Sequence, residues 1–140
     1  MKPEKSGTVQ YGVLPWRHTQ RLEVMLITSR ETARWVIPKG WPMKDLSGPL
    51  TAAQEAFEEA GIAGDVDTQA IGAYPYLKRL KDGSMRPLTV EVFALRVDRE
   101  HAEWPEVHER QRRWFSLAEA AEAVDEAELA DIIRAFDPKV

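Results

Sequence analysis

The sequence predicts an α+β fold in which helices cover both faces of a mixed β-sheet, an α/β/α sandwich. Two observations carry this prediction. The chain begins with runs rich in β-forming residues, continues with one run rich in Ala and Glu, and then has further β-rich runs followed by two helical runs. This order is typical of a layered domain. The 140 residues contain no repeat or linker and are enough for one hydrophobic core. We therefore expect a single domain over residues 1–140.

The first elements are predicted to be strands. Residues 8–17 and 21–29 are rich in Val, Leu, Ile and Tyr, and the polar residues 18–20 between them suit a hairpin. Residues 34–38 form a shorter β-rich run that ends at Pro38. An irregular loop is expected to follow, because it holds further proline and glycine residues.

A helix is predicted over residues 51–60, which are rich in Ala and Glu. Thr51 is the expected N-cap, and Gly61 stands where a left-handed residue ends a helix. The face expected to be buried consists of Leu50, Ala53, Phe57 and Ala60.

The rest of the chain is predicted to hold a hairpin and two helices. Residues 70–80 and 86–97 are β-rich and flank an Asp-Gly pair at 82–83, a strong signal for a tight turn. The run 112–124 passes from a short strand into a helix capped at Ser116. An amphipathic helix is expected over residues 126–136.

Composition narrows the possible functions. Apolar residues make up 44% and charged residues 30%, as in ordinary globular proteins. The net charge of −4 argues against a partner that is a nucleic-acid polymer. There is no cysteine, so any metal must be bound by oxygen or imidazole ligands. No apolar run is long enough to span a bilayer, and we expect no membrane partner and a cytoplasmic protein.

The predicted helix over residues 51–60 concentrates negative charge. Glu55, Glu58 and Glu59 are spaced i, i+3 and i+4, and therefore fall within an arc of roughly 100°. Such like-charged pairs each destabilise an isolated helix by a few tenths of a kcal/mol. A hard divalent cation would reverse that effect, because Mg²⁺ binds carboxylate oxygens and bridges to phosphates. The alternative is a plain solvated face, as we expect for the similarly spaced glutamates after residue 116.

The context of these acids resembles the Nudix box, G-x5-E-x7-R-E-U-x-E-E-x-G-U, where U is aliphatic. Without a gap, the box places its opening glycine at Gly40 and its closing pair at Gly61-Ile62. The Glu-Glu pair of the box is Glu58-Glu59. The preceding run RWVIPKG and the order of elements extend the resemblance over nearly the whole chain.

Two positions depart from the box. The first acid is Leu46 here, with Asp45 beside it as a possible substitute. The Arg-Glu pair is Gln54-Glu55, and Gln54 lies four residues before Glu58, where an arginine would orient that carboxylate. Glutamine still donates a hydrogen bond but brings no charge.

The resemblance implies a Nudix fold and hydrolysis of a diphosphate linked to another group, with Mg²⁺ or Mn²⁺. It implies Glu55 and Glu59 as principal metal ligands and the Gly40 carbonyl as a further one. Glu58 is implied as the general base that activates water, as a ligand, or as both. A later carboxylate is a possible further ligand or alternative base, and the candidates are Glu91, Glu103 and Glu106.

The nature of the substrate is indicated by basic residues. The chain is most similar to the diphosphoinositol polyphosphate and diadenosine polyphosphate hydrolase branch, in which Ser29, Arg30 and Arg110 would bind phosphate. Lys39 replaces a glycine of that branch and would add a phosphate contact. The sequence does not decide between these two types of substrate. It also leaves open whether the protein is a monomer or a homodimer. The competing hypotheses are a catalytically lapsed domain that binds a nucleotide or phosphate as a sensor, and a structural module.

Overall fold

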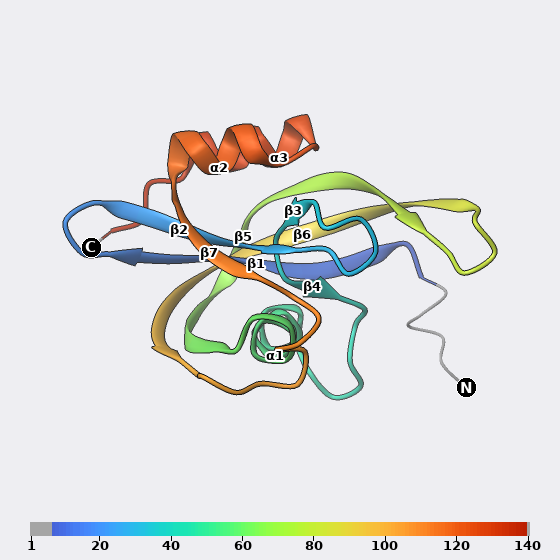
Figure 1. Ribbon diagram of the computed structural model, residues 1–140, viewed down its shortest axis with the longest axis horizontal. Helices are drawn as coiled ribbons and strands as arrows, with labels where there is room; N and C mark the ends of the chain where they lie inside the picture. Colours follow the sequence, from blue (N-terminus) through green and yellow to red (C-terminus); the bar gives the residue numbers. More distant parts are fainter. Residues whose placement is uncertain (1–6, 140) are drawn as a thin grey trace.

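The computed structural model describes residues 7–139, which form one mixed sheet with helices on both faces. Figure 1 shows α1 below the sheet, and α2 and α3 together above it. The strands are β1 (Val9–His18), β2 (Leu22–Thr28), β3 (Trp35–Val36), β4 (Lys39–Gly40), β5 (Ile62–Arg79), β6 (Met85–Glu100) and β7 (Arg112–Ser116). The helices are α1 (Gly48–Ala60), α2 (Leu117–Ala123) and α3 (Ala127–Ala135). The predicted α+β class with a mixed sheet is confirmed.

The sheet has strand order β3-β2-β1-β6-β5, with β4 paired to β1 and β7 paired to β2. The β1–β6 pairing is parallel, and all other pairings are antiparallel. Tyr11 of β1 stands opposite Gly40 of β4. This pairing fixes the loop that precedes α1 against the centre of the sheet.

Two hydrophobic cores fill the spaces between the layers. Because successive strand residues point to opposite faces, Val13 packs toward α1 while Leu14 packs toward α2 and α3. The core beneath α1 contains small helix residues, Ala52, Ala56 and Ala60, which let the helix lie close to the sheet. No helix among residues 7–139 is long and apolar enough to cross a membrane.

Helix α1 begins earlier than the sequence indicated. Its N-cap is Ser47, whose hydroxyl accepts a hydrogen bond from the Leu50 amide at 3.3 Å. The prediction of Thr51 as N-cap is therefore wrong, and Thr51 is a fully buried residue inside the helix. Gly48 and Pro49 looked like loop residues, but proline is well tolerated in the first helical turn. Gly61 ends the helix in the left-handed region with φ of 68°, as predicted.

The buried face of α1 also differs from the prediction. Leu50 is 52% exposed, whereas Ala52 and Ala56 are fully buried. Ala60 is fully buried, as predicted. The face is rotated because the carboxylate-bearing side of the helix also lies partly against the protein, and Glu59 is only 8% exposed.

The remaining elements follow the prediction with shifted ends. Strand β5 starts at Ile62, directly after the helix, and is interrupted by register shifts, which explains why its first half was not recognised. Residues 39–40, expected in a loop, pair with β1 as β4. The Asp82-Gly83 turn is confirmed, with Gly83 at φ of 87°, and Ser116 caps α2.

Candidate active site

Gly40 lies directly against the carboxyl end of Glu55. A Cβ atom built on Gly40 would overlap the Glu55 carboxyl group. Strand β4 and helix α1 thus approach each other closely at this point, and a side chain at residue 40 would displace the Glu55 carboxyl group. The structure brings these two predicted site residues together.

We predict that Gly40→Ala impairs both the fold and the site. Overpacking of this kind destabilises proteins by about 1–3 kcal/mol. Displacement of the Glu55 carboxylate by about 1 Å is expected to lower kcat roughly 100-fold. Thermal unfolding and steady-state kinetics measure the two effects, and an alanine variant with unchanged kcat would contradict this placement of Glu55.

The Glu55 and Glu59 side chains, one helical turn apart, are close enough for each to affect the pKa of the other. Burial, the charge of Glu59 and the hydrogen bond to Glu59 raise the pKa of Glu55 to about 8. Burial also raises the pKa of Glu59, and the positive charges of Arg110 and Lys39 oppose this shift. Two neighbouring carboxylates repel each other when both are ionised, and a cation bound between them would remove this repulsion.

Protein groups hold Glu59 from two sides. The Lys39 amide donates a hydrogen bond to Glu59 Oε1 at 3.3 Å. The Arg110 guanidinium lies 3.6 Å from Glu59 Oε2 and also donates to Glu106 Oε1 at 2.8 Å and to the Thr28 carbonyl at 3.1 Å. The Arg110 side chain is only 9% exposed, so Glu59 has a fixed partner.

Glu58 is oriented by the residue that departs from the Nudix box. The Gln54 amide donates a hydrogen bond to Glu58 Oε2 at 2.8 Å, one helical turn away. The hydrogen bond that Gln54 was expected to donate is therefore present. Asp45, the suggested substitute for the missing acid, lies in an exposed turn with φ of 67°, next to the 40% exposed Leu46.

We predict that Gln54→Ala lowers kcat roughly 10-fold, in the range typical of residues that orient a functional side chain. Gln54→Arg should keep or raise the wild-type kcat, since arginine supplies the same hydrogen bond together with a charge. Steady-state kinetics of both variants test this. Equal rates for the alanine variant and the wild type would show that Gln54 does not position Glu58.

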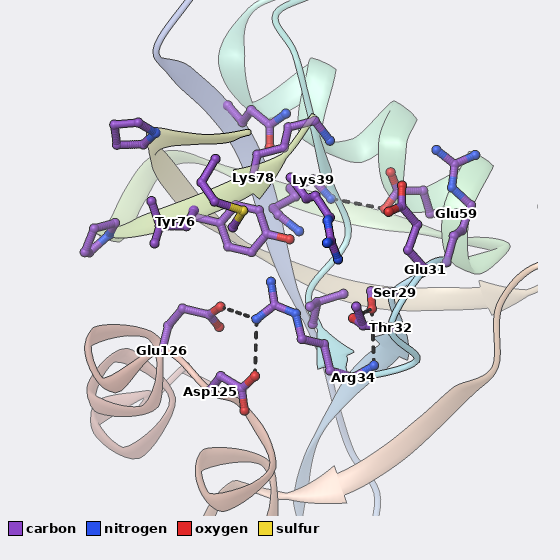
Figure 2. Close-up of a pocket in the computed structure, with 18 of the residues that line it drawn as sticks. Ser29, Glu31, Thr32, Arg34, Lys39, Glu59, Tyr76, Lys78, Asp125 and Glu126 are labelled. Carbon is purple, nitrogen blue, oxygen red and sulfur yellow. Dashed lines mark hydrogen bonds and ion pairs between the residues drawn. The ribbon is translucent and has the colours of Figure 1, made fainter. Parts of the chain in front are cut away.

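A cavity of about 700 Å³ adjoins Glu59. All four residues predicted to bind the substrate line it with Glu59: Ser29, Arg30, Lys39 and Arg110. Ser29 shares a hydrogen bond with the Thr32 hydroxyl at 2.7 Å, and Arg30 pairs with Glu109 at 3.2 Å. Burial lowers the pKa of Lys39 to about 8. Figure 2 shows Lys39 and Ser29 facing the same space as Glu59.

Comparison with known proteins identifies the family. The NUDIX domain family model matches residues 8–136. This chain belongs to the NUDIX domain family. Arabidopsis thaliana "Nudix hydrolase 4" is 32% identical over 138 residues, covering 89% of this chain and 63% of the relative. Arabidopsis thaliana "Nudix hydrolase 21, chloroplastic" is 31% identical over 134 residues, covering 89% and 64%.

The chain spans a little under two thirds of the length of these two relatives. Their names do not test the predicted cytoplasmic location, which stays a prediction. Among solved structures, the C. elegans Ap4A hydrolase is similar with a TM-score of 0.65 and 20% identity, covering 91% of this chain and 93% of that chain. This likeness confirms the predicted Nudix fold.

The donor groups of this Nudix domain fit a hard divalent cation. Within residues 7–139, no three Asp, Glu or His side chains are already arranged as a metal site. Glu55 and Glu59 nevertheless supply two carboxylates, of which Glu55 lies against the backbone of Gly40, and such oxygens are the ligands that Mg²⁺ and Mn²⁺ prefer.

Some residues of the site were not given a role from the sequence. Of the three later carboxylates considered, Glu106 lies near the pair, where its charge contributes to the raised pKa of both Glu55 and Glu59. The four-residue spacing of Glu106 and Arg110 was the feature of the sequence that could have indicated an ion pair between them. The acids that line the cavity from the α2–α3 link, Asp125 and Glu126, were not predicted.

Proposed function

We propose that this Nudix domain is a Mg²⁺- or Mn²⁺-dependent pyrophosphohydrolase that cleaves a diphosphate linkage in a polyphosphorylated small molecule. The single observation that carries the proposal is that Glu55, placed against Gly40, and the buried Glu59 project from one helix beside a cavity that Glu59 lines together with Ser29, Arg30, Lys39 and Arg110. A diphosphoinositol polyphosphate and a dinucleoside polyphosphate both have the required charge density. The hydrolase names of the relatives support this reaction class.

Each predicted residue has a role in this proposal. Glu55, Glu59 and the Gly40 carbonyl hold the cation, which neutralises charge on the diphosphate and acidifies water when bound. Arg110 fixes Glu59 through their 3.6 Å ion pair. Ser29, Arg30 and Lys39 line the cavity and bind phosphate oxygens by charge-assisted hydrogen bonds.

Glu58 is the proposed general base. Gln54 holds one carboxylate oxygen of Glu58, and the other accepts a proton from the attacking water. The resulting hydroxide attacks one phosphorus in line, the P–O–P bond breaks, and the leaving phosphate departs with the bonding electrons. Glu58 then returns the proton to solvent.

A substrate panel with and without Mg²⁺ tests the proposal. Diadenosine polyphosphates, diphosphoinositol polyphosphates, nucleoside triphosphates and ADP-ribose are incubated with folded protein, and the released products are separated and quantified. We expect Mg²⁺-dependent turnover of at least one polyphosphate. Folded protein that turns over no member of the panel would contradict the proposed activity.

A sensor that binds without hydrolysis is the second candidate function. It is favoured by the exposed Leu46, which stands where the box has an acid. This function predicts tight binding of a panel member without product, and binding that Glu58→Gln leaves unchanged. Turnover that depends on Glu58 would exclude it.

A further inference from the structure

The chain that leads from β6 into β7 runs past the end of helix α1 and closes it. Residues 101–112 form this capping segment, which Figure 1 shows in yellow and orange beside the helix. An α-helix leaves the carbonyl groups of its last turn without partners inside the helix. In α1 the Gly61 amide donates to the first of these carbonyls, that of Phe57, at 2.9 Å. The carbonyls of residues 58–60 therefore need donors from elsewhere.

The capping segment donates to the backbone of both acids that end the Nudix box helix. The Glu106 amide donates a hydrogen bond to the Glu58 carbonyl at 3.1 Å. The Trp104 indole N–H donates to the Glu59 carbonyl at 3.1 Å. Arg110, from the same segment, lies 3.6 Å from the Glu59 carboxylate. The segment thus holds Glu59 at its backbone and at its side chain.

Arg112 binds the final carbonyls of the helix. Its Nη1 donates to the Ala60 carbonyl at 2.8 Å and to the Gly61 carbonyl at 3.3 Å. Its Nη2 donates to the His101 carbonyl at 2.8 Å, which ties the two ends of the capping segment together. The last turn of α1 has no basic residue of its own. Arg112 therefore supplies the positive charge that stabilises the carbonyl end of a helix.

The Trp104 ring packs between this guanidinium and the backbone. The Arg112 Cζ atom lies 4.2 Å from the ring centroid. A Cβ atom built on Gly61 would overlap the indole, so glycine lets the ring lie against the chain as it leaves the helix. The indole and the guanidinium therefore support each other against the end of α1.

We propose that Trp104 and Arg112 are positioning residues, which fix the backbone of Glu58 and Glu59 where these acids act on the cation and the attacking water. The inference rests on the proposed function, because it takes the roles of the two acids from it. Neither Trp104 nor Arg112 lines the cavity, so both act through the helix. Catalysis is sensitive to such placement, because a displacement of about 1 Å can cost roughly 100-fold in rate.

Two variants each remove one part of the cap. Trp104→Phe keeps a ring but loses the N–H that donates to the Glu59 carbonyl. Arg112→Lys keeps the charge but loses the planar fork that reaches the Ala60 and His101 carbonyls together. We expect each variant to lower kcat about 10-fold and to raise the Mn²⁺ dissociation constant about 10-fold, as for residues that support metal ligands. KM should change less than kcat, because neither residue lines the cavity.

Trp114→Phe and Arg113→Lys are the matched controls. Trp114 is also a half-buried tryptophan, but its indole N–H donates to the exposed Glu100 carboxylate at 3.3 Å. Arg113 is exposed and lies over the Phe115 ring, 4.7 Å from its centroid. Both controls should keep kcat and the Mn²⁺ dissociation constant within about two-fold of wild type. Thermal unfolding shows that each assay is carried out on folded protein.

Mn²⁺ binding tests the inference apart from turnover, because electron paramagnetic resonance counts the free ion without any substrate. If the wild type binds Mn²⁺ but turns over no substrate, weaker binding in the two cap variants and not in the controls would still support the inference. Cap variants that bind Mn²⁺ and turn over substrate like the wild type would overturn it and leave the proposed function standing. Losses of equal size in the controls would also overturn it. A wild type that neither binds Mn²⁺ nor turns over substrate would overturn both.

Discussion

Glu59→Gln is expected to lower kcat/KM roughly 1000-fold, more than the 10- to 100-fold typical of a residue that only supports a metal ligand. Glutamine is nearly the same size and can still accept the hydrogen bond from the Lys39 amide, so the fold should persist. It supplies only a neutral amide oxygen, which binds a hard divalent cation more weakly than a carboxylate does. Steady-state kinetics at saturating Mg²⁺ measure the loss, and thermal unfolding checks the fold.

Glu119→Gln provides the matched comparison. Glu119 is an exposed acid that accepts a hydrogen bond from the Ser116 amide at 3.2 Å in the cap of α2, and glutamine can keep that cap. Its activity should remain within about two-fold of wild type, as for most surface substitutions away from a site. Equal losses in the two variants would show that the acids of α1 are an ordinary helix surface.

Glu58→Gln should lower kcat by about 10²- to 10⁴-fold, the range that a general base contributes. The Glu55–Glu59 pair stays intact in this variant, so cation affinity and KM should change little. kcat, KM and Mg²⁺ titration separate the two effects. A variant with wild-type kcat would assign proton removal to another carboxylate, of which Glu106 is the nearest candidate considered.

The sequence predicted the elements that local chemistry specifies. Gly61 is followed at once by a strand and has the positive φ that glycine tolerates, so the end of α1 was correct. The start was wrong because Gly48 and Pro49 are equally common in loops and in first helical turns. Strand β4 was missed because two residues carry no periodic pattern.

The site was predictable only where its residues are close in sequence. The spacing of Glu55 and Glu59 placed them on one side of a helix, but it did not predict that Glu59 is buried against the Lys39 amide and the Arg110 guanidinium. Asp125 and Glu126 line the cavity because a β-bridge between Trp35 and Val124 brings the α2–α3 link to the sheet. No spacing rule connects residues that far apart.

The central claim is that the Glu55–Glu59 pair binds a divalent cation. Its most direct test is a crystal of the protein soaked with Mn²⁺ and a non-hydrolysable substrate analogue, with anomalous diffraction used to locate the metal. The account predicts a Mn²⁺ ion bound by the carboxylates of Glu55 and Glu59 and bridged to a phosphate of the analogue. A well-ordered crystal with no anomalous peak there, and with the carboxylates turned toward solvent, would contradict it.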